Sequence, residues 1–487
     1  MNNIDIKKMF AEGLKLFQSK SYEQAFEIFK KILVLSPNNI NTLVILSQLC
    51  KKKNDSDNYE FYLKKIIEID KKNYKALNNL ATFYKDNGLN NKAEKLYLDS
   101  LKINSKYDKS LFNLGLLYEE KGFLEKAENL YLKALEKEKN IPSIIYKLIR
   151  INPDYFNKVD LTAIKNISNN ANSDIEEKAY SYFILAIDER NKNNIENEIK
   201  YLSIGHELIF NSNPLYLNEK KYWINEIPKK FSNKIKFINI EKNIEEKNNF
   251  YPIFVMGLPR SGTTLVESLI SSNKKKIDNY GETFIIPNVI KKILENNSDE
   301  LLLDISLIKS KVCEKYLKIS NNKKMKSSLF VDKTLENIFF IDIIKKIFPF
   351  SKIIVCERDY FDNFVAIFQQ CLQGLSWAHK KSSILKYIQN FDNFVKKIKT
   401  QNINNIYFVD LIELTENPEL SSKKILDFCN LDWDESVLKF YERNDLVIKT
   451  ASNVQLRKKI TKYDKNRFKE YQNPLKEYFD KINSLKI

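Results

Sequence analysis

The fold of this chain is decided by the stretch Ile253-Phe254-Val255-Met256-Gly257-Leu258-Pro259-Arg260-Ser261-Gly262-Thr263-Thr264-Leu265. An apolar run with β-branched and aromatic residues ends at Gly257, which predicts a buried strand. A helical apolar pattern then begins at Leu265 and continues through Leu269 and Ile270. The glycines at 257 and 262 let backbone N–H groups point inward, and the new helix aims its positive end at an anion. The stretch therefore predicts a strand, a phosphate-binding loop and a helix.

The residue after the second glycine argues against a nucleoside triphosphatase. The ATP and GTP loop reads G-x-x-x-x-G-K-[ST], in which Lys reaches the β- and γ-phosphates and the hydroxyl holds Mg²⁺. Thr263 stands where that Lys is required, and the nearby cation is Arg260. Two hydroxyls, an Arg inside the turn and no lysine suit a ligand with one phosphate-like group and no metal. A P-loop kinase is therefore disfavoured.

The segment P-R-S-G-T-T-L after a strand resembles the 5′-phosphosulfate loop of the sulfotransferases that use 3′-phosphoadenosine-5′-phosphosulfate (PAPS). It contains the family's Pro, basic residue, Ser-Gly and both threonines. The resemblance implies that Arg260, Ser261, Gly262, Thr263 and Thr264 bind the donor, and that Arg260 also takes part in catalysis.

Composition narrows the class of protein. The chain has 487 residues, 43% of them hydrophobic and 12% aromatic, which argues against disorder and allows several domains. No apolar run approaches the ~20 residues that cross a bilayer, and Met1 to Phe10 lacks the apolar core of a secretory signal. We therefore expect a cytoplasmic protein without a membrane span. The five cysteines are scattered and form no C-x-x-C pair, so we expect neither a disulfide framework nor a metal site.

The net charge of +17 would by itself suit a nucleic acid. The lysines are spread along the whole chain, however, and form no single cluster, so we expect no nucleic acid partner. Arginine is more informative, because five of the seven arginines lie in the C-terminal half. The planar guanidinium group matches phosphate and sulfate in a way that lysine does not.

Residues 1–145 repeat with a period of 34. A small residue recurs at Gly13, Ser47, Ala81 and Gly115, and a bulky one at Phe29, Leu63, Tyr97 and Tyr131. This pattern resembles four tetratricopeptide (TPR) repeats, which implies an all-α solenoid of helical hairpins. Two interpretations stay open: the groove of the solenoid docks an acceptor protein, a glycan or another partner, or the solenoid only braces the next domain.

Residues 146–249 keep a helical pattern without the repeat, and we expect them to bridge the solenoid to an enzyme domain at 250–487. His206 lies on an apolar face there, so we expect it to be a packed side chain. From Phe250 onward, strands alternate with helices. We expect strands at 253–256, 329–331, 352–356 and 405–409, with helices at about 263–271, 336–347 and 361–372. This order predicts a parallel α/β sheet with its ligand at the carboxyl ends of the strands.

Two charged residues are candidates for the chemistry. Lys333 belongs to a D-K-x-x-x-N segment that the family often carries, and could neutralise charge on the oxygen that leaves sulfur. Glu282, in Tyr280-Gly281-Glu282-Thr283, resembles the catalytic acid segment of tyrosylprotein sulfotransferases and would take the proton of the acceptor hydroxyl. His379, which we expect in a loop, and Asp332 remain as alternatives for the base, as does a group on the substrate.

The strand at 352–356 leads into Glu357-Arg358-Asp359, which resembles the family's 3′-phosphate segment R-D-P-R-D. The resemblance implies that Arg358 binds the 3′-phosphate. Tyr360 and Phe361 replace the usual Pro-Arg, however, and Ala366 replaces a phosphate-binding Ser. These departures leave open whether the site binds PAPS.

The segment T-A-S-N-V-Q-L-R at 450–457 resembles a stretch near the C-terminus of TPR-linked and tyrosylprotein sulfotransferases. The resemblance implies that Ser452, Arg457 and Arg467 close over the adenosine and its 3′-phosphate.

Taken with these resemblances, the sequence predicts a parallel-sheet α/β P-loop domain like that of the sulfotransferases, preceded by an all-α TPR solenoid. The predicted enzyme uses PAPS as donor, needs no metal, and transfers a sulfuryl group to a hydroxyl on protein tyrosine or a glycan. The alternative is a TPR interaction scaffold whose sulfotransferase-like domain is inactive. The acceptor, the ligand of the groove and the oligomeric state stay open.

Overall fold

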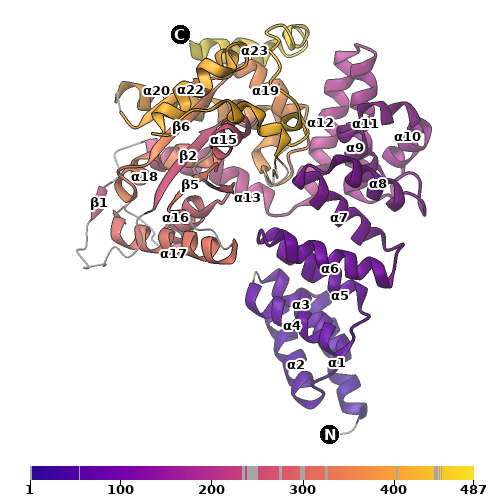
Figure 1. Ribbon diagram of the computed structural model, residues 1–487. Coiled ribbons are helices and arrows are strands. Elements are labelled where there is room, and N and C mark those ends of the chain that lie inside the picture. The colour runs from indigo at the N-terminus through magenta and orange to yellow at the C-terminus, as the bar shows by residue number, and fades with distance from the viewer. Residues whose placement is uncertain are drawn as a thin grey trace. The chain divides into compact units, whose positions relative to one another are not determined.

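The computed structural model describes residues 3–53, 55–232, 236–238, 250–273, 277–296, 302–323, 327–401, 404–443, 448, 450 and 452–486 (Figure 1). Its contacts divide the chain into two compact units. The first holds Met1–Tyr118 and Glu125–Lys139, and the second holds Glu119–Leu124 and Asn140–Ile487. The predicted end of the bridging region at residue 249 lies outside the described residues, and the separation of 146–249 from the α/β domain stays a prediction.

The N-terminal region consists of paired helices, and the pairs follow the predicted repeat of 34 residues. They are α1 Asn3–Gln18, α2 Tyr22–Leu35, α3 Ile40–Lys52, α4 Ser56–Ile69, α5 Tyr74–Asp86, α6 Asn90–Ile103, α7 Asp108–Lys121 and α8 Leu124–Ala134. The helices α3, α5 and α7 begin at residues 40, 74 and 108, which are 34 residues apart. Asn39 and Asn73 cap two of these starts, each accepting a backbone N–H at 3.0 Å.

In two of the repeats, the small position faces the bulky position. A Cβ added to Gly13 would lie 2.8 Å from Cζ of Phe29, and one added to Gly115 would lie 2.6 Å from Cε1 of Tyr131. Real Cβ atoms do not approach that closely, so a larger residue would push the paired helices apart. The all-α TPR-like fold of this region is therefore confirmed.

The second unit begins with helices that carry no 34-residue repeat. They are α9 Pro142–Ile151, α10 Leu161–Asn169, α11 Ile175–Asn191, α12 Ile195–Ser212, α13 Tyr216–Lys221 and α14 Ile227–Ser232. His206 on α12 is fully buried, and its Nε2 lies 2.7 Å from the carbonyl oxygen of Phe368, as expected of a packed histidine. Its Nδ1 lies 3.0 Å from Nδ1 of His379. The expectation that His379 lies in a loop is wrong, because it is buried in the 3-10 helix Ser376–His379.

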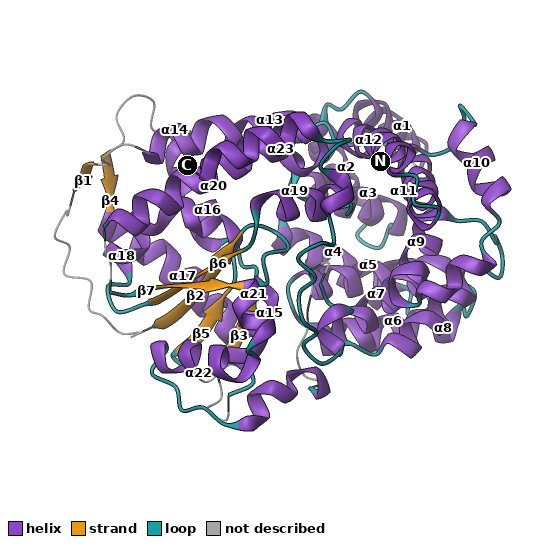
Figure 2. Ribbon diagram, turned by 90° about the horizontal axis from the view of Figure 1, so that it is seen from above, coloured by secondary structure: helices purple, strands orange, loops and turns teal. Residues whose placement is uncertain are grey.

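A five-stranded, all-parallel sheet forms the centre of the α/β region, in the order β3-β5-β2-β6-β7 (Figure 2). Its strands are β2 Tyr251–Gly257, β3 Asp278–Gly281, β5 Leu329–Asp332, β6 Lys352–Glu357 and β7 Ile406–Asp410. The sequence predicts four of them and misses β3. A separate two-stranded parallel pair joins β1 Lys236–Ile238 to β4 Leu302–Asp304. The predicted α/β class with a parallel sheet is confirmed.

The helices after the strands follow the prediction with two differences. Helix α15 spans Thr263–Ser271, as predicted. The second helix begins as the 3-10 helix Leu335–Phe340 and continues as α18 Ile341–Ile347, and α19 Tyr360–Phe368 ends before residue 372. The remaining α-helices are α16 Ile285–Asn296, α17 Ile305–Lys323, α20 Lys381–Thr400, α21 Leu411–Glu416, α22 Pro418–Phe428 and α23 Lys476–Asn483. Among the described residues, no helix is both long and apolar enough to span a bilayer.

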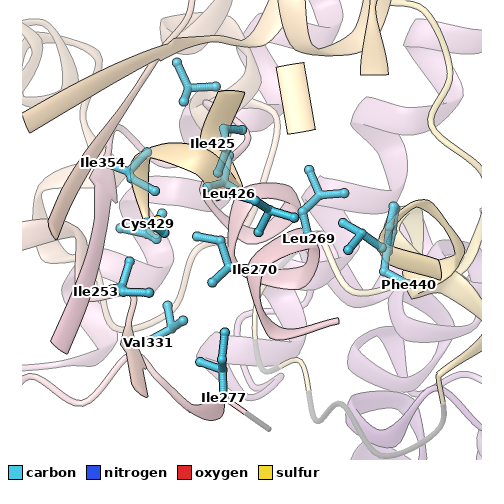
Figure 3. Packing of buried hydrophobic residues seen from close by; sticks show 14 of the residues in the cluster. Ile253, Leu269, Ile270, Ile277, Val331, Ile354, Ile425, Leu426, Cys429 and Phe440 are labelled. Carbon is cyan, nitrogen blue, oxygen red and sulfur yellow. The ribbon is translucent and has the colours of Figure 1, made fainter. Parts of the chain in front are cut away.

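One face of the sheet packs against α15 and α22 (Figure 3). Strand residues Ile253, Val331 and Ile354 meet Leu269 and Ile270 of α15, and all five are at most 1% exposed. Because side chains alternate along a strand, Phe254 and Phe330 point to the opposite face. There they contact Phe348 and Tyr316, with ring centroids 6.1 and 4.8 Å apart respectively. Burial on both faces explains why these strands appear as continuous apolar runs in the sequence.

Candidate functional site

The loop between β2 and α15 has the backbone of a compact anion-binding turn. Gly262 has φ +93°, and a Cβ there would lie 2.7 Å from Cδ1 of Leu411, so the position requires glycine. Oγ of Ser261 donates to the carbonyl oxygen of Leu258 at 2.8 Å. Nδ2 of Asn363 on α19 donates to the carbonyl oxygen of Pro259 at 2.7 Å. The loop is thus fixed from both sides before α15 begins.

The side chain of Arg260 joins the phosphate loop to the segment that contains Ser452 and Gln455. Its Nη1 donates to Oγ of Ser452, and its Nη2 donates to Oε1 of Gln455 at 2.8 Å. Its carbonyl oxygen accepts from Nη1 of Arg358 at 2.9 Å. Nε of Arg260 is buried and has no partner within the part of the chain that the structure describes. That orphaned donor fits an anionic ligand at the loop.

Four arginines concentrate positive charge around the phosphate loop. The pKa of Arg260 is lowered to about 10, first by burial and then by the charges of Arg150, Arg358 and Arg467. Mutual repulsion of this kind is relieved when a polyanion binds. Arg150 lies on α9, in the helices predicted only to form a bridge, and no motif in the sequence singles it out.

Arg358 is held by an aromatic side chain that the sequence analysis did not identify. Its Nε and Nη2 donate to the hydroxyl of Tyr463 at 3.0 and 2.7 Å, and that hydroxyl donates to Oδ2 of Asp362. With the bond to Arg260, these contacts use three of the guanidinium's five N–H groups. Two N–H groups are left for a phosphate. Tyr463 lies between Arg457 and Arg467 in the sequence, where no motif marks it.

The three departures from the family pattern serve packing. The hydroxyl of Tyr360 donates to Oδ1 of Asp392 at 3.2 Å, the ring of Phe361 packs against Phe479, and Ala366 is buried. Where the structure describes the cavity wall, none of the three side chains belongs to it.

The predicted catalytic pair is in direct contact. Nζ of Lys333 forms an ion pair with Oε1 of Glu282, and Lys333 is 1% exposed. Burial alone would lower the pKa of Lys333, but the carboxylates of Glu282 and Glu267 raise it above its ordinary value. Lys333 is therefore a charged ammonium group in an environment with little water.

Asp332 and Thr334 at the end of β5 position the segment that carries Glu282. Oδ2 of Asp332 accepts from the hydroxyls of Thr283 and Tyr316, each at 2.6 Å. Oγ1 of Thr334 accepts the backbone N–H groups of Thr283 and Phe284 at 3.0 and 3.1 Å. Burial raises the pKa of Asp332, and these hydrogen bonds oppose the rise. Asp332 thus acts as a fixed acceptor, which argues against its use as the base.

One cavity of about 660 Å³ connects these groups. Among the residues predicted from sequence, its wall includes Arg260, Gly262, Thr263, Thr264, Glu282, Arg358, Ser452 and Arg467. Ser261 and Lys333 are buried and do not belong to the wall. Arg457 also lies outside it, donating to the carbonyl oxygens of Arg443 and Glu120 at 2.8 and 3.3 Å. Ala451 of the T-A-S stretch lies outside the described residues.

Glu336 lines the cavity and was not predicted, because its place inside the D-K-x-x-x-N segment does not reveal that it is buried. In the described part of the chain, no group of three or more His, Cys, Asp or Glu side chains could hold a metal ion.

Models of two protein families match parts of this chain. Residues 252–435 match the sulfotransferase family, and residues 62–95 and 108–139 match tetratricopeptide repeats. An uncharacterized protein of Aquifex aeolicus (strain VF5) is 30% identical over 236 residues, which cover 45% of this chain and 31% of that relative. The chain thus spans less than a third of the relative's length.

Several solved structures resemble part of the chain weakly. Pseudomonas aeruginosa pilF is 16% identical, with a TM-score of 0.34, over 40% of this chain and 88% of that one. A thermophilic TPR protein of Thermus thermophilus is 18% identical, with a TM-score of 0.31, over 37% of this chain and 98% of that one. The matched family models give this chain a sulfotransferase family domain at residues 252–435 and tetratricopeptide repeats at residues 62–95 and 108–139.

Proposed function

We propose that the chain is a PAPS-dependent sulfotransferase that transfers a sulfuryl group to a hydroxyl of a protein tyrosine or a glycan. One observation carries the proposal: the guanidinium-rich phosphate loop lines the same cavity as Glu282, whose carboxylate pairs with Lys333. A donor with two anionic groups and an acceptor that must lose a proton need those two environments side by side.

The phosphate-loop end would hold the donor. Backbone N–H groups of the loop and the hydroxyls of Thr263 and Thr264, with Arg260, suit the 5′-phosphosulfate. Arg358 and Arg467 suit the 3′-phosphate, with Ser452 beside the loop. A contribution from Arg457 remains a proposal, since its guanidinium group lies outside the cavity wall.

The chemistry follows from the pair of Lys333 and Glu282. Glu282 accepts the proton of the acceptor hydroxyl as that oxygen bonds to sulfur, and the bond from sulfur to the phosphate oxygen breaks. Protonation of Glu282 removes the negative charge that holds Lys333. The ammonium group of Lys333 can then stabilise the charge that develops on the leaving phosphate oxygen. The products are a sulfated acceptor and 3′-phosphoadenosine-5′-phosphate (PAP).

We extend the proposal to the remaining regions of the chain. The TPR region would dock the acceptor protein or glycan, or a partner that presents it, because stacked helical hairpins form extended binding surfaces. The enzyme would act in the cytoplasm, without a bound metal.

A second candidate is a TPR scaffold whose sulfotransferase-like domain is inactive. One observation favours it: Tyr463 and Arg260 already engage three N–H groups of Arg358. Binding measurements separate the two. Thermal unfolding should shift upward with PAP and not with ATP and Mg²⁺ if the domain is an enzyme of this class.

The variant Arg260→Ala tests the loop assignment by calorimetry. It should remove PAP binding while the protein stays folded, because a charge-assisted contact is lost. Lys424→Ala is the control, since it removes an exposed cation that pairs with Glu413 away from the cavity. Unchanged PAP affinity in Arg260→Ala would contradict the assignment, and no PAP binding by the parent protein would favour the scaffold.

A further inference from the structure

One carboxylate in the cavity wall has no part in the proposed reaction. Glu336 lies in the first turn of the 3-10 helix Leu335–Phe340, is 2% exposed, and lines the same cavity as Glu282. Its Oε2 has no hydrogen-bond partner among the residues that the structure describes. A buried carboxylate oxygen without a donor destabilises the fold, so a ligand that supplies a donor there binds favourably.

The negative charges around Glu336 outnumber the positive ones. Lys333 interacts electrostatically with Glu282, Glu267 and Glu336, and its Nζ is paired with Glu282. Glu267 is 4% exposed, and its Oε1 also lacks a partner among the described residues. Burial, and then the charge of Glu282, raises the pKa of Glu336 to about 7, while Lys333 opposes the rise. Three carboxyl groups thus share one ammonium group, an arrangement that repels an anionic acceptor and attracts a cationic one.

Apolar side chains also belong to the wall of this cavity. Phe284, Leu335 and Leu375 line the same cavity. Apolar side chains around a few polar groups are typical of a pocket that buries an organic ligand and orients it by those groups. An acceptor that fits this wall has an apolar body.

We propose that Glu336 determines acceptor specificity by accepting a hydrogen bond from a cationic nitrogen of the acceptor. The preferred acceptor then combines a hydroxyl, an apolar body and an ammonium or guanidinium group. This inference rests on the proposed function, because it assigns this part of the cavity to the acceptor. It goes beyond that function by stating that the acceptor carries a positive charge.

The test compares two phenols that differ only in an ammonium group. Tyramine and 4-ethylphenol share the ring, the hydroxyl and a two-carbon chain, and only tyramine carries an ammonium group. We expect calorimetry on the PAP-bound protein to show about tenfold tighter binding of tyramine, since a charge-assisted hydrogen bond is gained. Glu336→Gln should abolish this preference without changing the affinity for 4-ethylphenol. Glu413→Gln, which removes an exposed carboxylate outside the cavity, should keep it.

A stability measurement separates a specificity role from a structural one. Replacing a buried carboxylate whose Oε2 has no hydrogen-bond partner among the described residues should stabilise the protein, so Glu336→Gln and Glu336→Leu should raise Tm by on the order of 2–4 °C. A lower Tm in both variants would show that Glu336 supports the fold, and would overturn the proposal.

The binding results also have distinct meanings. If the protein binds the two phenols with equal affinity, or binds neither, the proposed role of Glu336 is overturned. If the same protein still binds PAP, the proposed function stands. If the protein binds no PAP, the proposed function fails, and the two phenols measured without PAP still decide the preference.

Discussion

The ion pair between Lys333 and Glu282 allows the strongest quantitative prediction. Lys333 is 1% exposed and the side chain of Glu282 is 32% exposed. Removing one partner of a fully buried pair costs about 3–5 kcal/mol. Glu282 is partly solvated and Glu267 still interacts with Lys333, so we expect Glu282→Gln and Lys333→Met each to lower the free energy of unfolding by about 1–3 kcal/mol.

The double variant measures the interaction itself. In Glu282→Gln with Lys333→Met, neither charge is left without its partner, so the loss should be smaller than the sum of the single losses by about 1–2 kcal/mol. Urea denaturation of the parent and the three variants gives all four free energies. Losses that add within about 0.5 kcal/mol would show that the two side chains are neighbours without energetic coupling.

The same variants separate stability from chemistry. Glu282→Gln should lower kcat by about 10²–10⁴ while PAP binding is unchanged, because a general base is lost and the donor end is intact. Lys333→Met should also lower kcat, but its defect should shrink with a donor whose leaving group is more acidic. In the double variant, stability should partly recover and turnover should not. Parental turnover in Glu282→Gln across pH would refute the reasoning and make Glu282 a structural carboxylate.

Three further predictions concern other parts of the second unit. Gly262→Ala should lower the free energy of unfolding by about 2–4 kcal/mol, because the residue has a positive φ and its new Cβ would meet Leu411. The control Gly374→Ala has the same φ of 93° and nothing within 4 Å, so it should lower that free energy by only about 1–2 kcal/mol. Equal losses in urea denaturation would contradict this reasoning. Arg358→Lys should reduce the preference for PAP over adenosine 5′-phosphate by about tenfold, because lysine cannot reproduce the planar fork, and an undiminished preference by calorimetry would remove Arg358 from the 3′-phosphate site. Burial lowers the pKa of His206 to about 4, and burial together with His206 lowers that of His379 to about 3, so only the unfolded chain binds protons at these residues just below the ordinary pKa of 6.5. The free energy of unfolding should therefore fall by about 1.4 kcal/mol per pH unit for each histidine on acidification toward pH 4, and His379→Gln should show a smaller slope than the parent.

Much of the fold could be predicted because it depends on local patterns. The spacing of two nearby glycines marks the phosphate loop. A short run of apolar residues marks each of the strands β2, β5, β6 and β7. Strand β3 was missed because Asp278-Asn279-Tyr280-Gly281 is short, lies at the edge of the sheet, and buries only Tyr280. Helix α19 was predicted too long because the apolar pattern continues past Phe368, where the structure has already left the helix.

The candidate site was predictable only where a motif marked it. Glu282 and Arg358 follow strands within recognisable segments, and both line the cavity. Arg150, Glu336 and Tyr463 could not be found in this way, because their importance depends on charges and contacts between residues far apart in the chain. The hydrogen bond from Arg358 to Tyr463 joins residues 105 positions apart, which no local pattern encodes.

The strand order β3-β5-β2-β6-β7 also determines which properties of the site can vary separately. Glu282 follows β3 and Lys333 follows β5, whereas Arg358 follows β6 on the other side of β2. Substitutions beyond β3 and β5 should therefore alter the range of acceptors while the nucleotide requirement is retained. A directed-evolution library restricted to residues 283–286 and 335–339, with Glu282 kept, should diversify acceptors without rebuilding the donor site.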